Sequence, residues 1–136
     1  MPKYKEKVKS HDKYLSNLDR FCADTIKTLK SEKICPRSAR WLGAYEIVAI
    51  AQRIHTLAHE ANETKVSNVK EKEDRHALQT QVIALIKTLG EKYEFCSGIY
   101  DIHADSLNKW LEEKGRIQSW VESWQKNEET RYKDIG

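Results

Sequence analysis

Apolar side chains recur every three or four positions through four consecutive segments of this chain, and nothing between them alternates as a strand would. The fourth segment keeps a near-heptad spacing through Leu107, Trp110, Leu111, Lys114, Ile117, Val121 and Trp124. Lys114 stands at an apolar position, where its methylene stem can take the place of an apolar side chain. Amphipathic helices with such stripes become stable when they share one core. The pattern therefore predicts an all-α protein with the architecture of an antiparallel up-down-up-down four-helix bundle.

Short polar connections separate the expected helices, which cover about residues 11–31, 36–62, 68–100 and 105–125. Asn68 resembles an N-terminal helix cap, and Glu71, three residues later, resembles the acidic residue that bonds back to such a cap. This pair marks the start of the third helix. Connections this short join antiparallel neighbours. We expect one bundle domain over residues 11–125, a basic flexible N-terminal tail over residues 1–10 and a loosely ordered C-terminal tail over residues 126–136.

The formal net charge of +3 is concentrated at the beginning of the chain. Residues 1–10 hold four lysines and one glutamate, so the remainder carries equal numbers of basic and acidic residues. This balance excludes a uniformly basic surface, which is the usual footprint of nucleic-acid binding. Any contact with nucleic acid must use a local patch or the N-terminal tail itself.

The three cysteines, Cys22, Cys35 and Cys96, form no Cys-x-x-Cys pair. An odd number without that spacing indicates neither a disulfide framework nor a zinc knuckle. Cys22 and Cys96 fall on apolar stripes, so we expect them in the core. No apolar run is as long as a membrane span, and residues 1–13 lack the apolar stretch of a secretory signal. We expect a cytoplasmic protein without membrane contact.

The apolar residues of the second helix cover more than one face. They are Leu42, Tyr45, Ile47, Val48, Ile50, Ala51, Ile54, Leu57, Ala58 and Ala61. Such a helix is either the most buried one of the bundle or part of an interface between subunits. We favour the interface, and therefore expect a homo-oligomer.

His55 and His59 stand four residues apart on the second helix, a spacing that puts two imidazoles on one face and can bind a transition metal. Glu60 and His76 are possible further ligands. However, the His-Glu-x-x-His order of zinc proteases is missing, and the spacing fixes no third ligand. We therefore expect solvated or core-edge histidines, with no metal and no cofactor.

Arg53 and His59, with five residues between them, are similar to the catalytic pattern of the HEPN ribonucleases, which are also helical bundles. A histidine general acid or base beside an arginine that stabilises a phosphorane-like charge would suit RNA cleavage. Short patterns of this kind also arise by chance, and Ile54 stands where that family usually has a polar residue. The chain holds no glycine-rich phosphate loop and no nucleophile with a spaced base partner. We expect a protein that is not an enzyme.

The turn before the second helix carries the best candidate binding residues, Lys33, Arg37, Arg40 and Trp41. Two guanidinium groups three residues apart at the start of a helix can hold a phosphate, and an adjacent indole can stack on a base. The alternative is that both arginines pair with acids of neighbouring helices while Trp41 closes the end of the bundle.

The segments 34–43, with the sequence ICPRSARWLG, and 58–62, with the sequence AHEAN, resemble the four helix bundle protein family. That family includes the 23S rRNA intervening-sequence protein and the accessory variability determinant (Avd) of diversity-generating retroelements. The resemblance implies a homopentameric bundle that binds RNA or DNA through basic residues and associates with the retroelement's reverse transcriptase. Arg37 and Arg40 match the basic positions near the turn.

Together these features predict a non-enzymatic Avd-like accessory protein, an oligomeric scaffold for a reverse transcriptase and its RNA template or cDNA. One alternative is a protein-interaction bundle without nucleic-acid binding, which fits the neutral body of the chain. A HEPN-like RNase is the other.

Overall fold

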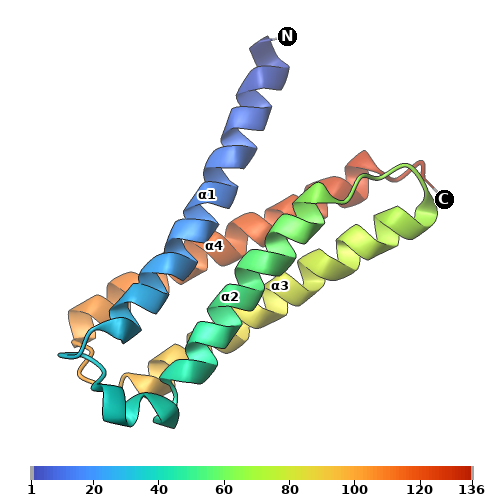
Figure 1. Cartoon of the computed structure of the whole chain (residues 1–136). Helices are drawn as coiled ribbons and strands as arrows, with labels where there is room; N and C mark the ends of the chain where they lie inside the picture. Colours follow the sequence, from blue (N-terminus) through green and yellow to red (C-terminus); the bar gives the residue numbers. More distant parts are fainter. Residues whose placement is uncertain (1, 136) are drawn as a thin grey trace.

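The chain folds into four α-helices and one short 3₁₀ helix, and the prediction of an all-α protein is confirmed (Figure 1). The computed structural model describes the backbone of residues 2–135 and the side chains of residues 11–135, and this part of the chain contains no strand. The elements are α1 (Pro2–Lys30), the 3₁₀ helix η1 (Arg37–Leu42), α2 (Ala44–Glu63), α3 (Val69–Cys96) and α4 (Ala104–Arg131). Helices α1 and α3 each pack against both α2 and α4, so the four long helices surround one core.

The core is built from apolar residues of all four long helices. Its fully buried larger side chains include Leu18, Leu29, Ile47, Ile54, Val82, Ile86, Leu89 and Val121. The stem of Lys114 does lie along the seam between α3 and α4, because a methyl group added to Gly90 would meet Lys114 Cδ at 2.8 Å. Cys22 and Cys96 are buried as predicted, and Cys35 is buried too.

Most of the wide apolar surface of α2 is used inside the chain. Seven of its residues are buried: Ala44, Ile47, Ala51, Ile54, Leu57, Ala58 and Ala61. Val48 and Ile50 are partly buried against the core, whereas Tyr45 is exposed. Of the two explanations for this surface, burial within the bundle and an interface between subunits, the structure favours burial within the bundle.

Helix α3 begins at the predicted cap. Asn68 accepts a hydrogen bond from the Glu71 backbone N–H at 2.9 Å, which satisfies a donor that the helix itself leaves free. The Glu71 carboxylate in turn accepts from the Ser67 backbone N–H at 3.1 Å. Glu71 therefore accepts from Ser67, the residue before the cap, and not from Asn68 itself, as a capping box would require.

The predicted start of the second helix at residue 36 is wrong. Residues 37–42 form η1 instead, and α2 begins only at Ala44. The Tyr100 hydroxyl holds this junction, because it donates to the Ala39 carbonyl at 2.8 Å and accepts from the Ala44 N–H at 3.1 Å. Gly43 sits so close to α3 that a methyl group there would lie 2.5 Å from Cys96 Sγ.

The first and last helices extend beyond their predicted limits. Helix α4 continues to Arg131, past the expected end near residue 125, and Glu128 is buried in the segment expected to be loosely ordered. At the other end α1 begins at Pro2. The side chains of the predicted basic tail, residues 1–10, lie outside the described residues. None of the described helices combines the length and apolar character needed to span a bilayer.

Candidate functional sites

The connection between α1 and α2 brings two of the predicted binding residues onto one carboxylate. Glu32 lies 3.7 Å from Arg37 Nε and 3.8 Å from Arg40 Nη2. Its other oxygen accepts a hydrogen bond from the Arg37 backbone N–H at 3.2 Å. The two guanidinium groups are thus close enough to share one anion, and Glu32 provides that anion within the chain.

Arg40 is bound much more firmly than Arg37. Arg40 Nη2 donates to the Lys30 carbonyl at 2.7 Å and Arg40 Nε to the Cys35 carbonyl at 3.3 Å. The Lys30 carbonyl belongs to the last turn of α1, whose carbonyls have no partner inside the helix. Arg40 therefore caps α1, and only 17% of its side chain is exposed, against 82% for Arg37.

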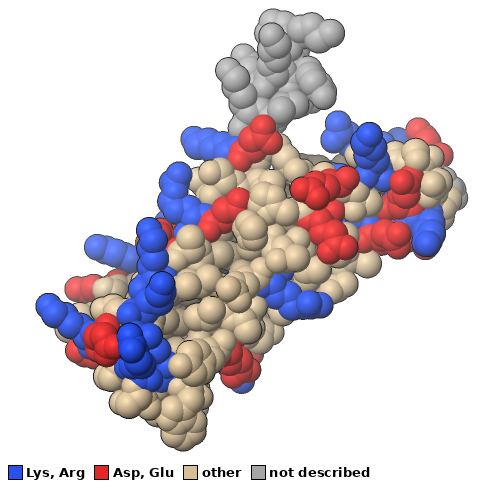
Figure 2. Space-filling view, in the orientation of Figure 1, with Lys and Arg blue, Asp and Glu red and all other residues tan. Residues whose placement is uncertain are grey.

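Lys33, Arg37 and Trp41 remain on the surface of this connection. Trp41 is 71% exposed and does not close the end of the bundle. Further exposed apolar residues lie on η1, the first turn of α2, the last turn of α3 and the turn after α3, which meet at Gly43, Cys96 and Tyr100. We call this group the apolar end, and its members are Trp41, Leu42, Tyr45, Phe95 and Ile99. The tip at the lower edge of Figure 2, where α2 begins in Figure 1, is formed largely by uncharged residues.

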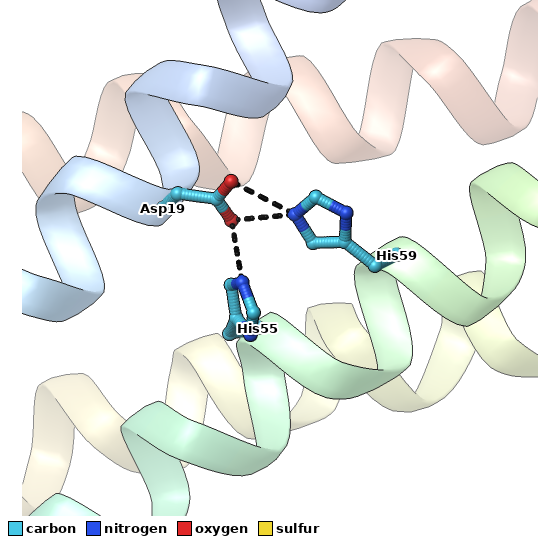
Figure 3. Close-up of side chains that lie close together, drawn as sticks. All are labelled: Asp19, His55 and His59. Carbon is cyan, nitrogen blue, oxygen red and sulfur yellow. Dashed lines mark hydrogen bonds and ion pairs between the residues drawn. The ribbon is translucent and has the colours of Figure 1, made fainter.

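A second cluster lies on the side of the bundle, between α1 and α2. His55 and His59 both point their Nε2 atoms at the carboxylate of Asp19, which projects from α1 (Figure 3). His59 Nε2 lies 2.8 Å from each oxygen of Asp19, and His55 Nε2 lies 3.5 Å from Oδ1. The sequence spacing identified the two histidines, but nothing in it pointed to Asp19.

The other residues considered for metal binding or catalysis lie apart from this cluster. His76 is on α3, where its Nδ1 lies 4.0 Å from Glu129. Glu60 is exposed and is not part of the three-residue group. Arg53 is exposed on α2, and among the described contacts of His59 the partner is Asp19 and not Arg53. The two residues of the HEPN-like pattern are therefore not joined by a hydrogen bond in this conformation.

A buried ion pair joins α3 to α4 at the end of the bundle opposite η1. Arg75 Nε donates to Glu128 Oε1 at 2.8 Å, and Arg75 Nη1 donates to the Thr64 carbonyl at 2.9 Å. Glu128 also accepts from Gln79 Nε2 at 2.8 Å and from Trp124 Nε1 at 2.7 Å. The network joins the beginning of α3 to the end of α4 and to the connection that follows α2.

Cys22 and Cys96 are unsuited to nucleophilic chemistry. Burial raises the pKa of the Cys22 thiol to about 12, and the nearby Asp19 carboxylate adds to this effect. Burial likewise raises the pKa of Cys96, with a further contribution from Glu46. Both thiols therefore stay protonated near neutral pH, whereas a nucleophile must be a thiolate.

Comparison with known proteins gave no match among family models, and no significant match among curated proteins or solved structures.

Proposed function

We propose that this chain is a non-enzymatic, homo-oligomeric accessory protein, similar in role to the Avd proteins that it resembles in sequence. In this proposal the bundle is a scaffold for a reverse transcriptase and its RNA template, in the cytoplasm. The three buried, free cysteines support that location, because oxidising compartments favour disulfides.

The proposal includes a bundle whose helices alternate in direction, up-down-up-down. Contacts between neighbouring helices support this order, because each pairs a residue in the first half of one helix with a residue in the second half of its neighbour. His11 of α1 contacts Asn62 of α2, and Glu46 of α2 lies 3.4 Å from Lys92 of α3. Tyr93, late in α3, stacks on Trp110, early in α4, with 3.9 Å between ring centroids.

The observation that carries the proposal is the apolar end. Trp41, Tyr45 and Phe95 are 71%, 60% and 69% exposed, although aromatic side chains of this size gain free energy from burial. Aromatic residues are enriched at protein interfaces and at their energetic hot spots. Because most apolar residues of α2 are buried inside the chain, we assign the interface between copies to the apolar end.

Self-association can be tested by light scattering coupled to size-exclusion chromatography. We expect the purified protein to have a mass well above the 15.9 kDa of one chain, and a pentamer if the resemblance extends to assembly. The double variant Trp41→Ser/Phe95→Ser removes two large apolar side chains from the apolar end. We expect it to shift the distribution toward the monomer.

Val69→Ser is the matched control, because Val69 is an exposed apolar residue, 45% exposed, at the start of α3. It should leave the mass of the wild-type protein unchanged. A wild-type monomer at micromolar concentration would contradict both the interface and the proposed assembly. Co-expression with a reverse transcriptase encoded nearby, followed by co-purification, tests the partner separately.

Direct nucleic-acid binding is the second part of the proposal, and Lys33, Arg37 and Trp41 support it. These exposed residues offer two cations and an aromatic face on one connection. Glu32 competes with phosphate for Arg37, so Glu32→Gln should raise the affinity for RNA if this surface is used. An unchanged affinity in that variant would favour the alternative function, a protein-interaction bundle without nucleic-acid binding.

A further inference from the structure

The cluster of Asp19, His55 and His59 has no role in the proposed scaffold. It joins two helices, and one donor atom from each residue lies within 4.8 Å of the others. The three side chains are partly exposed, with 33% of Asp19, 52% of His55 and 33% of His59 open to solvent. An ion from solution can therefore reach all three.

The spacing of the donors is close to that of a metal site. Two ligands of a tetrahedral zinc ion are about 3.3 Å apart, given metal–ligand distances of about 2.0–2.1 Å. The observed separations from Asp19 are 2.8 Å to His59 Nε2 and 3.5 Å to His55 Nε2. Small side-chain rotations suffice to admit an ion between them.

The chemistry of the donors selects the type of ion. Imidazole nitrogens bind zinc, copper, nickel and iron, whereas magnesium and calcium prefer oxygen ligands. Two imidazoles and one carboxylate leave at least one coordination position for water. Four-residue spacing on α2 presents both imidazoles on one side of the ion, and α1 supplies the carboxylate from the other.

We propose that Asp19, His55 and His59 bind one divalent transition-metal ion, for which zinc is the probe, and that the bound ion ties α1 to α2. Both histidines ligate through Nε2, so each carries its proton on Nδ1 in the bound state. The ion takes the place of the hydrogen bond between His59 and Asp19. This inference does not depend on the proposed scaffold function.

Isothermal titration of the full-length, untagged protein with zinc chloride tests the site, because an added polyhistidine tag would itself bind zinc. We expect one zinc ion per chain. His55→Ala, His59→Ala and Asp19→Asn should each lower the zinc affinity at least about tenfold. Substituting Co²⁺ should give the visible absorption of a four- or five-coordinate site.

His76→Ala is the matched control, because His76 is a partly exposed histidine near a carboxylate on another pair of helices. It should bind zinc as the wild-type protein does. Far-ultraviolet circular dichroism checks that each variant is folded, and Asp19→Asn keeps the size of the side chain. Loss of affinity in His76→Ala equal to that in His59→Ala would overturn the proposal, as would an unchanged affinity in Asp19→Asn.

Thermal unfolding tests the tie between the helices. A ligand that binds only the folded protein raises its stability. Zinc should therefore raise the melting temperature of the wild-type protein and of His76→Ala by the same amount, and that of His55→Ala clearly less at the same zinc concentration. No zinc-dependent shift in the wild-type protein would also count against the site.

Discussion

Among single residues, Glu128 is a buried acid whose carboxylate has three hydrogen-bond partners. Arg75, Gln79 and Trp124 all donate hydrogen bonds to its carboxylate. The side chains of Arg75 and Glu128 are only 12% and 9% exposed. Burial of two charges costs free energy, and the pair is stable only because each charge has a partner. No buried side-chain nitrogen or oxygen among the described residues lacks a hydrogen-bond partner.

Glu128→Gln is expected to destabilise the protein by about 3–5 kcal/mol, because it leaves the Arg75 charge buried and uncompensated. Urea unfolding followed by circular dichroism measures this change. Glu129→Gln is the control, since the neighbouring Glu129 side chain is 59% exposed, and its effect should stay within about 0.5 kcal/mol. Equal effects of the two substitutions would show that the Glu128 network contributes little.

Contacts between residues far apart in the chain were the least predictable from sequence. The spacing of His55 and His59 indicated a shared helix face, but Asp19 lies 40 positions before His59. Only the packing of α1 on α2 brings them together. The same limitation applies to Arg40, because its bond to the Lys30 carbonyl depends on the path of the intervening turn. Charge and position alone made Arg40 and Arg37 equivalent candidates.

Among the elements, the junction between η1 and α2 depends on the absence of a side chain at Gly43. A methyl group there would approach Cys96 Sγ to 2.5 Å, and the buried end of α3 has little room to move. We expect Gly43→Ala to lower the free energy of unfolding by about 1–3 kcal/mol. Combining it with Cys96→Ala should restore part of the loss, so the double variant should be more stable than additivity predicts.

Gly90→Ala provides the contrast for this prediction. A methyl group at Gly90 meets the stem of Lys114, which is flexible and can move, and alanine favours the helix by about 1 kcal/mol. We therefore expect no loss of stability in Gly90→Ala. Chemical denaturation of Gly43→Ala, Cys96→Ala, their double variant and Gly90→Ala measures both effects. An unchanged free energy of unfolding in Gly43→Ala would contradict the close contact.

The cap of α3 predicts a pH dependence. Hydrogen bonds from the Ser67 side chain and backbone hold the pKa of Glu71 below its ordinary value. A carboxyl whose pKa is lowered by folding stabilises the folded state above its ordinary pKa, and this contribution is lost as the pH falls through the lowered value. Ser67→Ala should move the pKa of Glu71 back toward its ordinary value. A titration of the Glu71 carboxyl carbon by nuclear magnetic resonance measures this pKa. The same pKa of Glu71 in the wild-type protein and in Ser67→Ala would contradict this assignment.

Sequence periodicity predicted the long helices better than their ends. The cap at Asn68 was recognisable because its hydrogen bond is local, from a residue three positions away. The end of α4 could not be recognised in the same way, because charged residues follow Trp124. The helix continues because Glu128 has a partner, Arg75, on α3. The break at Gly43 likewise depends on Tyr100, which lies beyond the far end of α3 in sequence.

At the scale of the whole molecule, charge is spread without a dominant sign. In Figure 2 basic side chains gather along the left edge of the visible face and a group of acidic side chains lies further right, while residues 11–136 together carry equal numbers of each. The formal excess lies in residues 1–10. A bundle of this kind cannot attract nucleic acid by its overall field, so binding must come from the N-terminal segment or from a local surface.

Two variants distinguish these sources of nucleic-acid binding. Deletion of residues 1–10 removes the formal charge excess, whereas Lys33→Ala/Arg37→Ala removes the exposed cations beside Trp41 and leaves the cap formed by Arg40 intact. If the local surface binds phosphate, the double variant should weaken RNA binding for all sequences alike. It should also reduce the slope of log K against log salt concentration by about 0.7–0.9 for each phosphate that the variant no longer neutralises. Filter binding over a range of salt concentrations measures both quantities. If the deletion abolishes binding while the double variant binds normally, the tail alone holds the RNA, and the neutral body with its apolar end is then a scaffold for proteins.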